Sequence, residues 1–133
     1  MAEPDYAALL RFRTALRKFN HWSEQQAAAV GLTHTQHQLL LAVKGHPDPR
    51  GPTTGETADY LLIRHHSAVD LIDRVEALGL LQRRRDDNDG RVVRLVLTAE
   101  GEERIRLLTS LHIRELQALE TVLEPLWEQG EGG

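Results

Sequence analysis

The sequence contains no cysteine and few aromatic residues. Its 133 residues include no cysteine at all, and aromatic side chains make up 5% of the chain. The lack of cysteine excludes disulfide bonds, thiolate metal ligands and thiol-based redox switches. Because aromatic residues are scarce, we expect a hydrophobic core built mostly from leucine, valine, isoleucine and alanine.

Long apolar runs are also missing. No run approaches the roughly 20 residues that a helix needs to span a bilayer. Residues 1–10 lack the basic segment and apolar stretch of a signal peptide. Together with the absence of cysteine, these observations predict a single cytoplasmic globular domain.

Motifs for catalysis and metal binding are absent as well. The chain has no glycine-rich phosphate loop, no G-x-S-x-G element and no HExxH motif. Ser67 follows two histidines, but neighbouring helical residues do not face each other, so no Ser–His pair is expected. His34 and His37 have a usable ligand spacing without a further ligand motif. The sequence predicts no enzyme, no cofactor and no functional metal site.

The charges are unevenly distributed along the chain. The net charge of −4 argues mildly against nucleic-acid binding. However, arginines gather within the middle of the sequence, at Arg64, Arg74, Arg83, Arg84, Arg85, Arg91 and Arg94. Acidic residues dominate from Glu100 onwards. A basic middle beside an acidic C-terminal region favours a phosphate-binding surface in the middle of the chain.

Apolar spacing and capping residues predict four helices before residue 80. They cover about 5–29, 33–45, 53–62 and 65–79. Thr33 with Gln36, and Thr53 with Glu56, have the spacing of capping boxes at the second and third helix starts. Three prolines and a glycine within residues 46–52 predict an irregular loop between those two helices.

The pattern changes after Gly79. Residues 81–85 and 91–97 have the character of short strands, and residues 87–90 have turn chemistry, in which we expect Gly90 to adopt a positive φ. Thr98 is expected to cap one long final helix, with an apolar stripe that reaches Leu123. The predicted fold is mainly α with a small β-hairpin, in the order of a winged helix-turn-helix.

This order of elements suggests how one domain contacts DNA twice. The second helix of a helix-turn-helix lies in the major groove, and its N-terminal residues meet base edges. Here that helix opens with His65, His66 and Ser67. The two histidines also have metal-ligand and pH-sensor interpretations, since histidine titrates near neutrality. Arg91 at the hairpin tip suits the negative potential of a narrow minor groove.

Five short motifs between Leu32 and Gly101 occur together in a familiar order. They are Leu32-Thr33 with Gln36 at a helix start, TGETA at 54–58, SAVDLIDRVEALGL at 67–80, RDDNDGR at 85–91 and VLTAEG at 96–101. In these motifs the sequence resembles the MarR family of winged helix-turn-helix transcriptional regulators. The Asp-x-Arg wing followed by the Leu-Thr-x-x-Gly element is the most specific part of the resemblance.

The resemblance implies an architecture and a mode of action. Residues 1–133 would form one MarR-like domain, with a DNA-binding lobe over 32–98 and dimerisation helices over 4–30 and 99–129. The protein would act as a homodimer on double-stranded DNA with a pseudo-palindromic operator, usually as a repressor that a small aromatic effector releases. Relatives often place two helices after the wing, whereas only about 35 residues follow Thr98 here.

Candidate site residues follow from the motifs and the resemblance. The DNA-binding candidates are Thr54, His65, His66, Ser67, Val69, Asp70, Arg74, Arg83, Arg85 and Arg91. Asp89 and Gly90 would shape the wing, with Asp89 holding Arg91 in place. An effector pocket would lie between the dimerisation helices and the lobe. Its candidate lining residues are Phe19, His21, Trp22, Leu39 and His112.

A second interpretation belongs to a different functional class. Winged helices also serve as protein–protein interaction modules without DNA binding, because a fold does not fix a function. The net negative charge and Asp70 favour this alternative, since a carboxylate near phosphates weakens DNA binding. The polar start of the recognition helix and Arg91 oppose it. Salt-dependent duplex binding separates the two interpretations.

Overall fold

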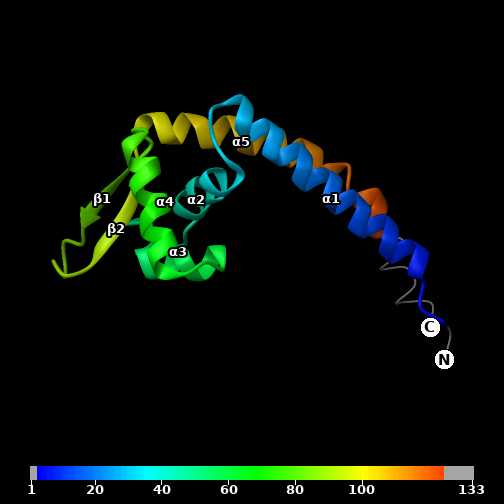
Figure 1. The fold of residues 1–133 in the computed structure, drawn as a ribbon, viewed down its shortest axis with the longest axis horizontal. Helices are drawn as coiled ribbons and strands as arrows, with labels where there is room; N and C mark the ends of the chain where they lie inside the picture. The colour runs from blue at the N-terminus through cyan, green and yellow to red at the C-terminus, as the bar shows by residue number, and fades with distance from the viewer. Residues whose placement is uncertain (1–2, 125–133) are drawn as a thin grey trace.

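The computed structural model describes residues 3–124 as a winged helix lobe with a helical arm (Figure 1). The elements follow in the order α1 (Tyr6–Ala29), α2 (His34–Lys44), α3 (Thr54–Leu61), α4 (His65–Ala77), β1 (Leu81–Arg85), β2 (Val93–Leu97) and α5 (Ala99–Gln117). This mainly helical fold with one hairpin confirms the predicted fold class. No helix within residues 3–124 is long and apolar enough to cross a membrane.

Side-chain caps fix the beginnings of the first three helices. The Asp5 carboxylate accepts a hydrogen bond from the Ala8 N–H at 2.9 Å. Both predicted capping boxes are present: the Thr33 hydroxyl accepts from the Gln36 N–H, and the Thr53 hydroxyl accepts from the Glu56 N–H. These bonds satisfy N–H groups that a helix start leaves unpaired, so short sequence motifs determine where the helices begin.

The turn between α3 and α4 forms the helix-turn-helix. Leu62 caps α3 with a φ of 58°, in the left-handed region that non-glycine residues rarely adopt. The Ile63 N–H donates back to the Ala58 carbonyl at 3.1 Å, which closes the end of α3. This tight turn sets the direction in which α4 leaves α3.

The wing is a two-stranded antiparallel sheet with an additional edge. β1 pairs with β2 so that Arg84 lies opposite Arg94. On the other side of β2, Thr53 forms a β-bridge with Arg94, and the Leu95 N–H donates to the Pro52 carbonyl at 2.8 Å. Gly51 has a φ of +93°, and a Cβ there would lie 1.9 Å from the Leu95 oxygen. Glycine therefore lets the α2–α3 loop lie directly against the wing.

The wing loop differs from the predicted turn. Gly90 is not among the residues with positive φ, and β2 begins at Val93 rather than at residue 91. The connection from 86 to 92 is too long for a two-residue hairpin turn, so it requires no left-handed residue. Instead, the Asp86 carboxylate accepts hydrogen bonds from the N–H groups of Asn88 and Asp89.

The core of the lobe is almost entirely aliphatic, as the composition predicted. Its fully buried members come from α2, α4, the wing and the first half of α5, and include Leu39, Leu40, Ile72, Val75, Leu80, Leu95, Ile105 and Leu108. A Cβ at Gly101 would lie 2.0 Å from the Leu80 oxygen. The glycine of the Leu-Thr-x-x-Gly element thus allows α5 to pack against the backbone after α4.

The final helix ends earlier than the sequence predicted. α5 stops at Gln117, a turn follows at Ala118 and Leu119, and residues 120–124 are helical again. The Leu119 N–H bonds to the carbonyl three residues back, at Leu116, which tightens and ends the last turn. The apolar stripe towards Leu123 is therefore divided between two helical segments. The expected boundary at residue 129 lies outside the described residues.

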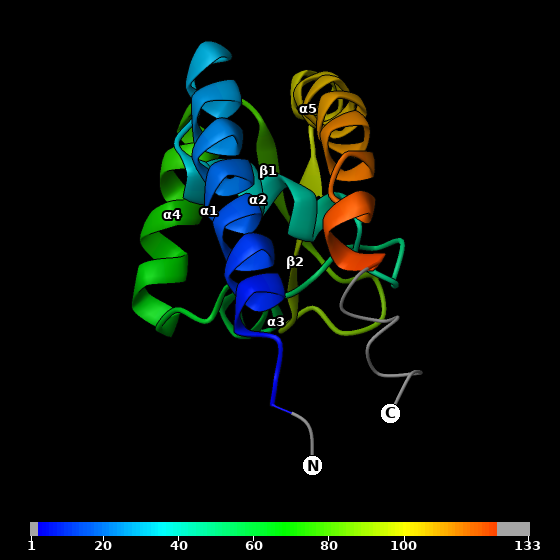
Figure 2. The same cartoon turned by 90° about the vertical axis from the view of Figure 1, so that its right-hand side faces the viewer.

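α1 and the second half of α5, residues 109–117, form the arm. They contact each other and run away from the lobe together (Figures 1 and 2). Several large apolar side chains of the two helices are exposed, namely Tyr6, Leu9, Leu10, Leu16, Ile113 and Leu116. The arm therefore has an apolar surface that the described chain does not cover.

Candidate nucleic-acid interface

One face of α4 is buried and the opposite face is polar. Ala68 and Ile72 are fully buried against the lobe. His66, Asp70 and Arg74 are exposed. Since residues four apart share a helix face, these three side chains form one outward row. This is the face that the sequence predicted for base contacts.

The remaining helix candidates lie near the starts of α3 and α4. His65, the first residue of α4, is exposed, and Ser67 and Val69 are partly exposed beside the outward row. Thr54 is the first residue of α3 and is also partly exposed. Free N–H groups at a helix start attract anions, so both positions suit contact with a phosphate or a base edge.

Arg91 extends from the wing loop into solvent. Its side chain is 92% exposed. The Asp89 carboxylate accepts hydrogen bonds from the Arg91 backbone N–H at 3.1 Å and from its Nε at 3.3 Å. The structure thus contains the expected Asp89–Arg91 pair, which restricts the arginine before any ligand arrives.

The two strand arginines differ in their surroundings. Arg85 is exposed. Arg83 donates to the Glu76 carboxylate at 2.6 Å and to Asp73 at 2.7 Å. Burial lowers the pKa of Arg83, but the two carboxylates raise it by a larger amount, so the net shift of the pKa is upward. Arg83 therefore joins β1 to α4, and its guanidinium is already occupied.

Asp86 organises the wing, although its sequence pattern indicates nothing beyond turn propensity. Its side chain is only 3% exposed, and it accepts from the Arg94 Nε at 2.5 Å and from Arg50 at 3.2 Å. The bond from Arg94, followed by the Asn88 N–H, lowers the pKa of Asp86. Turn propensity alone could not distinguish Asp86 from Asp87, because Arg50 is 36 residues away in the chain.

A cavity of about 370 Å³ lies between α1, α2 and α5. Of the pocket candidates, Phe19 and His112 line it, and the Trp22 ring packs 4.8 Å from the His112 ring. Leu39 belongs to the hydrophobic core instead, because it lies on the inward face of α2. His21 is exposed, with its Nε2 3.4 Å from Gln25. Sequence spacing placed these two residues on the correct helices but not on the cavity wall.

Three histidines meet at this cavity. The His112 Nδ1 lies 2.7 Å from the Leu108 carbonyl, which only accepts, so Nδ1 carries the hydrogen and Nε2 accepts from the Ser23 hydroxyl at 2.6 Å. The Nδ1 atoms of His34 and His37 are buried without a hydrogen-bond partner. Burial, then the neighbouring His112 and His34, lower the pKa of His37 to about 4. Within residues 3–124, no group of three or more potential ligands could hold a metal ion.

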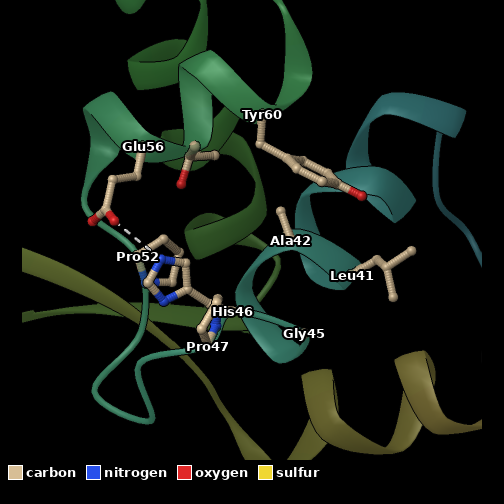
Figure 3. A pocket seen from close by; sticks show the side chains of 9 residues that line it. Leu41, Ala42, Gly45, His46, Pro47, Pro52, Glu56 and Tyr60 are labelled. Atoms are coloured by element: carbon tan, nitrogen blue, oxygen red, sulfur yellow. Dashed lines mark hydrogen bonds and ion pairs between the residues drawn. The ribbon is translucent and has the colours of Figure 1, made fainter.

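A second cavity, of about 330 Å³, lies between the end of α2, the following loop and α3. Its walls are mostly apolar, and Tyr60 borders it on the α3 side (Figure 3). At its edge, the His46 Nε2 lies 3.1 Å from the Glu56 carboxylate. The same carboxyl group completes the capping box of α3. This contact therefore joins the α2–α3 loop to the first helix of the helix-turn-helix.

Comparisons with known proteins agree with this geometry. Residues 30–92 match the sequence model of the MarR family. MepR, a transcription regulator of the Staphylococcus aureus multidrug efflux pump MepA, is 23% identical with a TM-score of 0.74, and the match covers 97% of this chain and 93% of that one. The same protein in a DNA complex gives 24% identity and a TM-score of 0.73, covering 98% and 93% of the two chains.

AbsC, a MarR family transcriptional regulator from Streptomyces coelicolor, is 20% identical with a TM-score of 0.66 over the full length of both chains. No curated protein sequence matches the chain significantly. The family match spans α2, the helix-turn-helix and most of the wing, and the structural matches extend over both arm helices. Residues 30–92 therefore match the MarR family of winged helix-turn-helix transcriptional regulators, and the described chain shares the fold of regulators in that family.

Proposed function

We propose that the protein binds a pseudo-palindromic DNA operator as a homodimer. The observation that carries this proposal is the joint position of two contact elements. The start of α4 and the wing loop both lie at the end of the lobe that is remote from α5 (Figures 1 and 2). α4 would enter the major groove with His65, His66, Ser67, Val69, Asp70 and Arg74, and Arg91 would enter the adjacent minor groove.

Phosphate contacts would supply much of the affinity. Thr54 lies at a helix start, and Arg85 is exposed on the wing. Each neutralised phosphate releases counterions, so affinity falls steeply as salt rises. Arg83 would contribute mainly by holding the wing against α4, because Asp73 and Glu76 already bind its guanidinium.

The exposed apolar face of the arm supports homodimerisation. Tyr6, Leu9, Leu10 and Leu16 all lie on α1, and all are exposed. Contiguous apolar surfaces of this kind mark association sites. Light scattering at micromolar concentration should give twice the 15.0 kDa mass of one chain. A mass of one chain would refute the dimer.

We also infer that the cavity between α1, α2 and α5 binds a small aromatic effector. Its aromatic neighbours and its buried, unpartnered imidazole nitrogens support this assignment. The cavity touches both the lobe and the arm, so a ligand there could favour one spacing of the two over the other. Release of DNA, and hence derepression, requires such a differential affinity. A panel of small aromatic acids and amines should include one that displaces the operator from the wild-type protein but not from a Ser23→Ala variant.

The deciding experiment is selection from a random duplex pool, followed by anisotropy titration of the selected duplex at two salt concentrations. A palindromic sequence with half-sites about one helical turn apart and a strong salt dependence would support the proposal. A duplex without symmetry would contradict the homodimer. A pool without enrichment would contradict DNA binding and favour the protein–protein interaction module.

A further inference from the structure

The wing loop is organised by one buried carboxylate. Asp86 stands at the first position after β1, and its Oδ1 accepts from the N–H groups of Asn88 at 2.8 Å and Asp89 at 3.2 Å. Asp89 in turn holds the backbone and the Nε of Arg91. A continuous set of hydrogen bonds therefore runs from Asp86 through Asp89 to the arginine at the tip.

The second oxygen of Asp86 joins the wing to the α2–α3 loop. Oδ2 accepts from the Nε of Arg94 on β2 and from the guanidinium of Arg50 in the loop. Arg50 is fixed by Asp48, which it contacts at 2.7 Å and 3.1 Å. Arg94 also donates to the Gly51 carbonyl at 2.9 Å. Four side chains, Asp48, Arg50, Asp86 and Arg94, thus form a cross-link that we call the wing clamp.

The loop that carries this clamp is itself attached to the helix-turn-helix. At its start, His46 pairs with Glu56 of α3 (Figure 3). At its end, Pro52 and Thr53 pair with β2. The loop cannot shift without disturbing α3. The clamp therefore holds the wing in a fixed position relative to the helix-turn-helix, which places α4.

We propose that Asp86 and Arg50 are positioning residues that fix the wing tip relative to the recognition helix. Neither side chain is assigned a contact with DNA; both act through Asp89 and Arg91. This inference rests on the proposed DNA-binding function. It predicts that loss of the clamp removes the minor-groove contribution of Arg91 and leaves the major-groove contacts of α4 in place.

A matched pair of variants tests this role. Asp87 is the next residue, and its carboxylate is exposed and takes no part in the hydrogen bonds of the clamp. Asp86→Asn and Asp87→Asn each remove one negative charge from the same loop. If only net charge mattered, both variants would bind DNA as tightly as the wild type or more tightly, because each lowers repulsion from phosphates.

The clamp predicts opposite results for the two variants. Asp86→Asn should weaken binding to the selected duplex about tenfold, similar to Arg91→Ala. A double variant that combines Asp86→Asn with Arg91→Ala should bind no more weakly than Arg91→Ala alone. Asp87→Asn should bind as the wild type does, or more tightly. Equal affinities of the two Asn variants, or additive losses in the double variant, would overturn the proposal.

Sequence preference separates positioning from a general loss of structure. When selection is repeated with Asp86→Asn, the preference at the outer, minor-groove base pairs should disappear, while the preference at the major-groove bases remains. Arg50→Lys keeps the charge but cannot bridge Asp48 and Asp86 with the same planar fork, so it should show the same selective loss. Loss of preference at all positions would indicate misfolding or a different role.

Hydrogen exchange in the free protein tests the clamp without DNA. The amide hydrogens of Asn88 and Asp89 should exchange about tenfold faster in Asp86→Asn than in Asp87→Asn, while the amides of α4 exchange unchanged. Equal exchange in the two variants would overturn the clamp itself. If the wild type selects no duplex although Asp86 protects these amides, the proposed function fails while the structural role of Asp86 stands.

Discussion

The lobe and the arm use the same apolar residue types in different ways. In the lobe, Leu39, Leu40 and Leu95 are fully buried in one core. In the arm, the adjacent residues Leu9 and Leu10 of α1 are exposed. Buried apolar area is the main favourable contribution to folding, so the lobe stabilises itself, whereas the arm gains full burial only against a second surface.

The two regions also differ in how they use polar groups. The lobe joins its parts with ion pairs across long sequence distances, such as Arg50 to Asp86 and Lys44 to Glu102. At the junction with the arm, His34 and His37 each leave a buried nitrogen without a partner. Unsatisfied buried polar atoms are rare in native proteins. The lobe is therefore complete in one chain, while the junction retains an unused capacity for hydrogen bonding.

The largest expected effect contrasts one leucine from each region. Leu40→Ala should lower the free energy of unfolding by about 3 kcal/mol, because it leaves a cavity in the core. Leu10→Ala should leave the lobe unchanged and instead weaken the proposed dimer. Urea unfolding at two protein concentrations distinguishes the two effects, since only the second depends on concentration. Equal, concentration-independent losses would contradict the division into lobe and arm.

The junction should lose stability in mild acid. His37 is 2% exposed, and its pKa is lowered from 6.5 to about 4, so the unfolded state binds more protons in this range. Stability is fully present above pH 6.5 and falls as the pH decreases towards 4, by about 2 kcal/mol between pH 6.5 and roughly pH 5. Urea titrations at these two pH values measure the loss of stability.

A His37→Gln variant serves as the control for this prediction. It cannot titrate, so its stability should be nearly constant over the same interval. The carboxylates of the wing clamp do not interfere, because hydrogen bonds from Arg94 to Asp86 and from Arg50 to Asp48 lower the pKa of each carboxyl below its ordinary value of 3.8. An unchanged pH dependence in His37→Gln would assign the acid sensitivity to another group.

The wing and the arm should respond differently to loss of an arginine. Arg91→Ala on the wing should weaken operator binding by about 1–3 kcal/mol and reduce the salt dependence, because it removes a minor-groove contact. Arg114→Ala removes the same charge from exposed α5 and should have little effect on DNA affinity. Anisotropy titrations on the selected duplex compare them. Similar losses would mean that net charge, rather than the wing, governs binding.

The smallest expected effect concerns the helix-turn-helix itself. Leu62 is 91% exposed and adopts a left-handed φ of 58°. Leu62→Gly should stabilise the lobe by about 1 kcal/mol, since glycine relieves that backbone strain and little apolar contact is lost. Leu78→Gly, at an exposed helix end with a φ of −74°, should instead be destabilising. Thermal unfolding of both variants measures the difference, and equal shifts would exclude strain at Leu62.

Local signals predicted most of the elements correctly. The capping boxes at Thr33 and Thr53, and the cap at Thr98, gave helix starts that the structure confirms. These signals work because the groups that satisfy a helix start lie within three residues of it. The DNA-binding candidates His66, Asp70 and Arg74 lie together on the exposed face of α4, because residues four apart share one side of a helix.

The sequence interpretation was wrong or incomplete where a residue's role depends on a contact distant in the sequence, or where a loop is longer than the expected turn. Gly90 needs no positive φ because Asp86 organises a longer loop. The end of α5 at Gln117 has no strong sequence signal, such as a glycine, before the break. Leu39 and Phe19 both carried an apolar signal, and only packing assigned one to the core and the other to the cavity.

The order of the helices, the hairpin and the arginine at its tip can be predicted from local sequence features, because capping, periodicity and turn chemistry act over a few residues. Tertiary structure alone decided the wing clamp, the histidine cavity and the exposed apolar face of the arm. Each of these depends on groups that lie dozens of residues apart and meet only when the chain folds, and the energy of a charge or an apolar surface depends on what finally surrounds it.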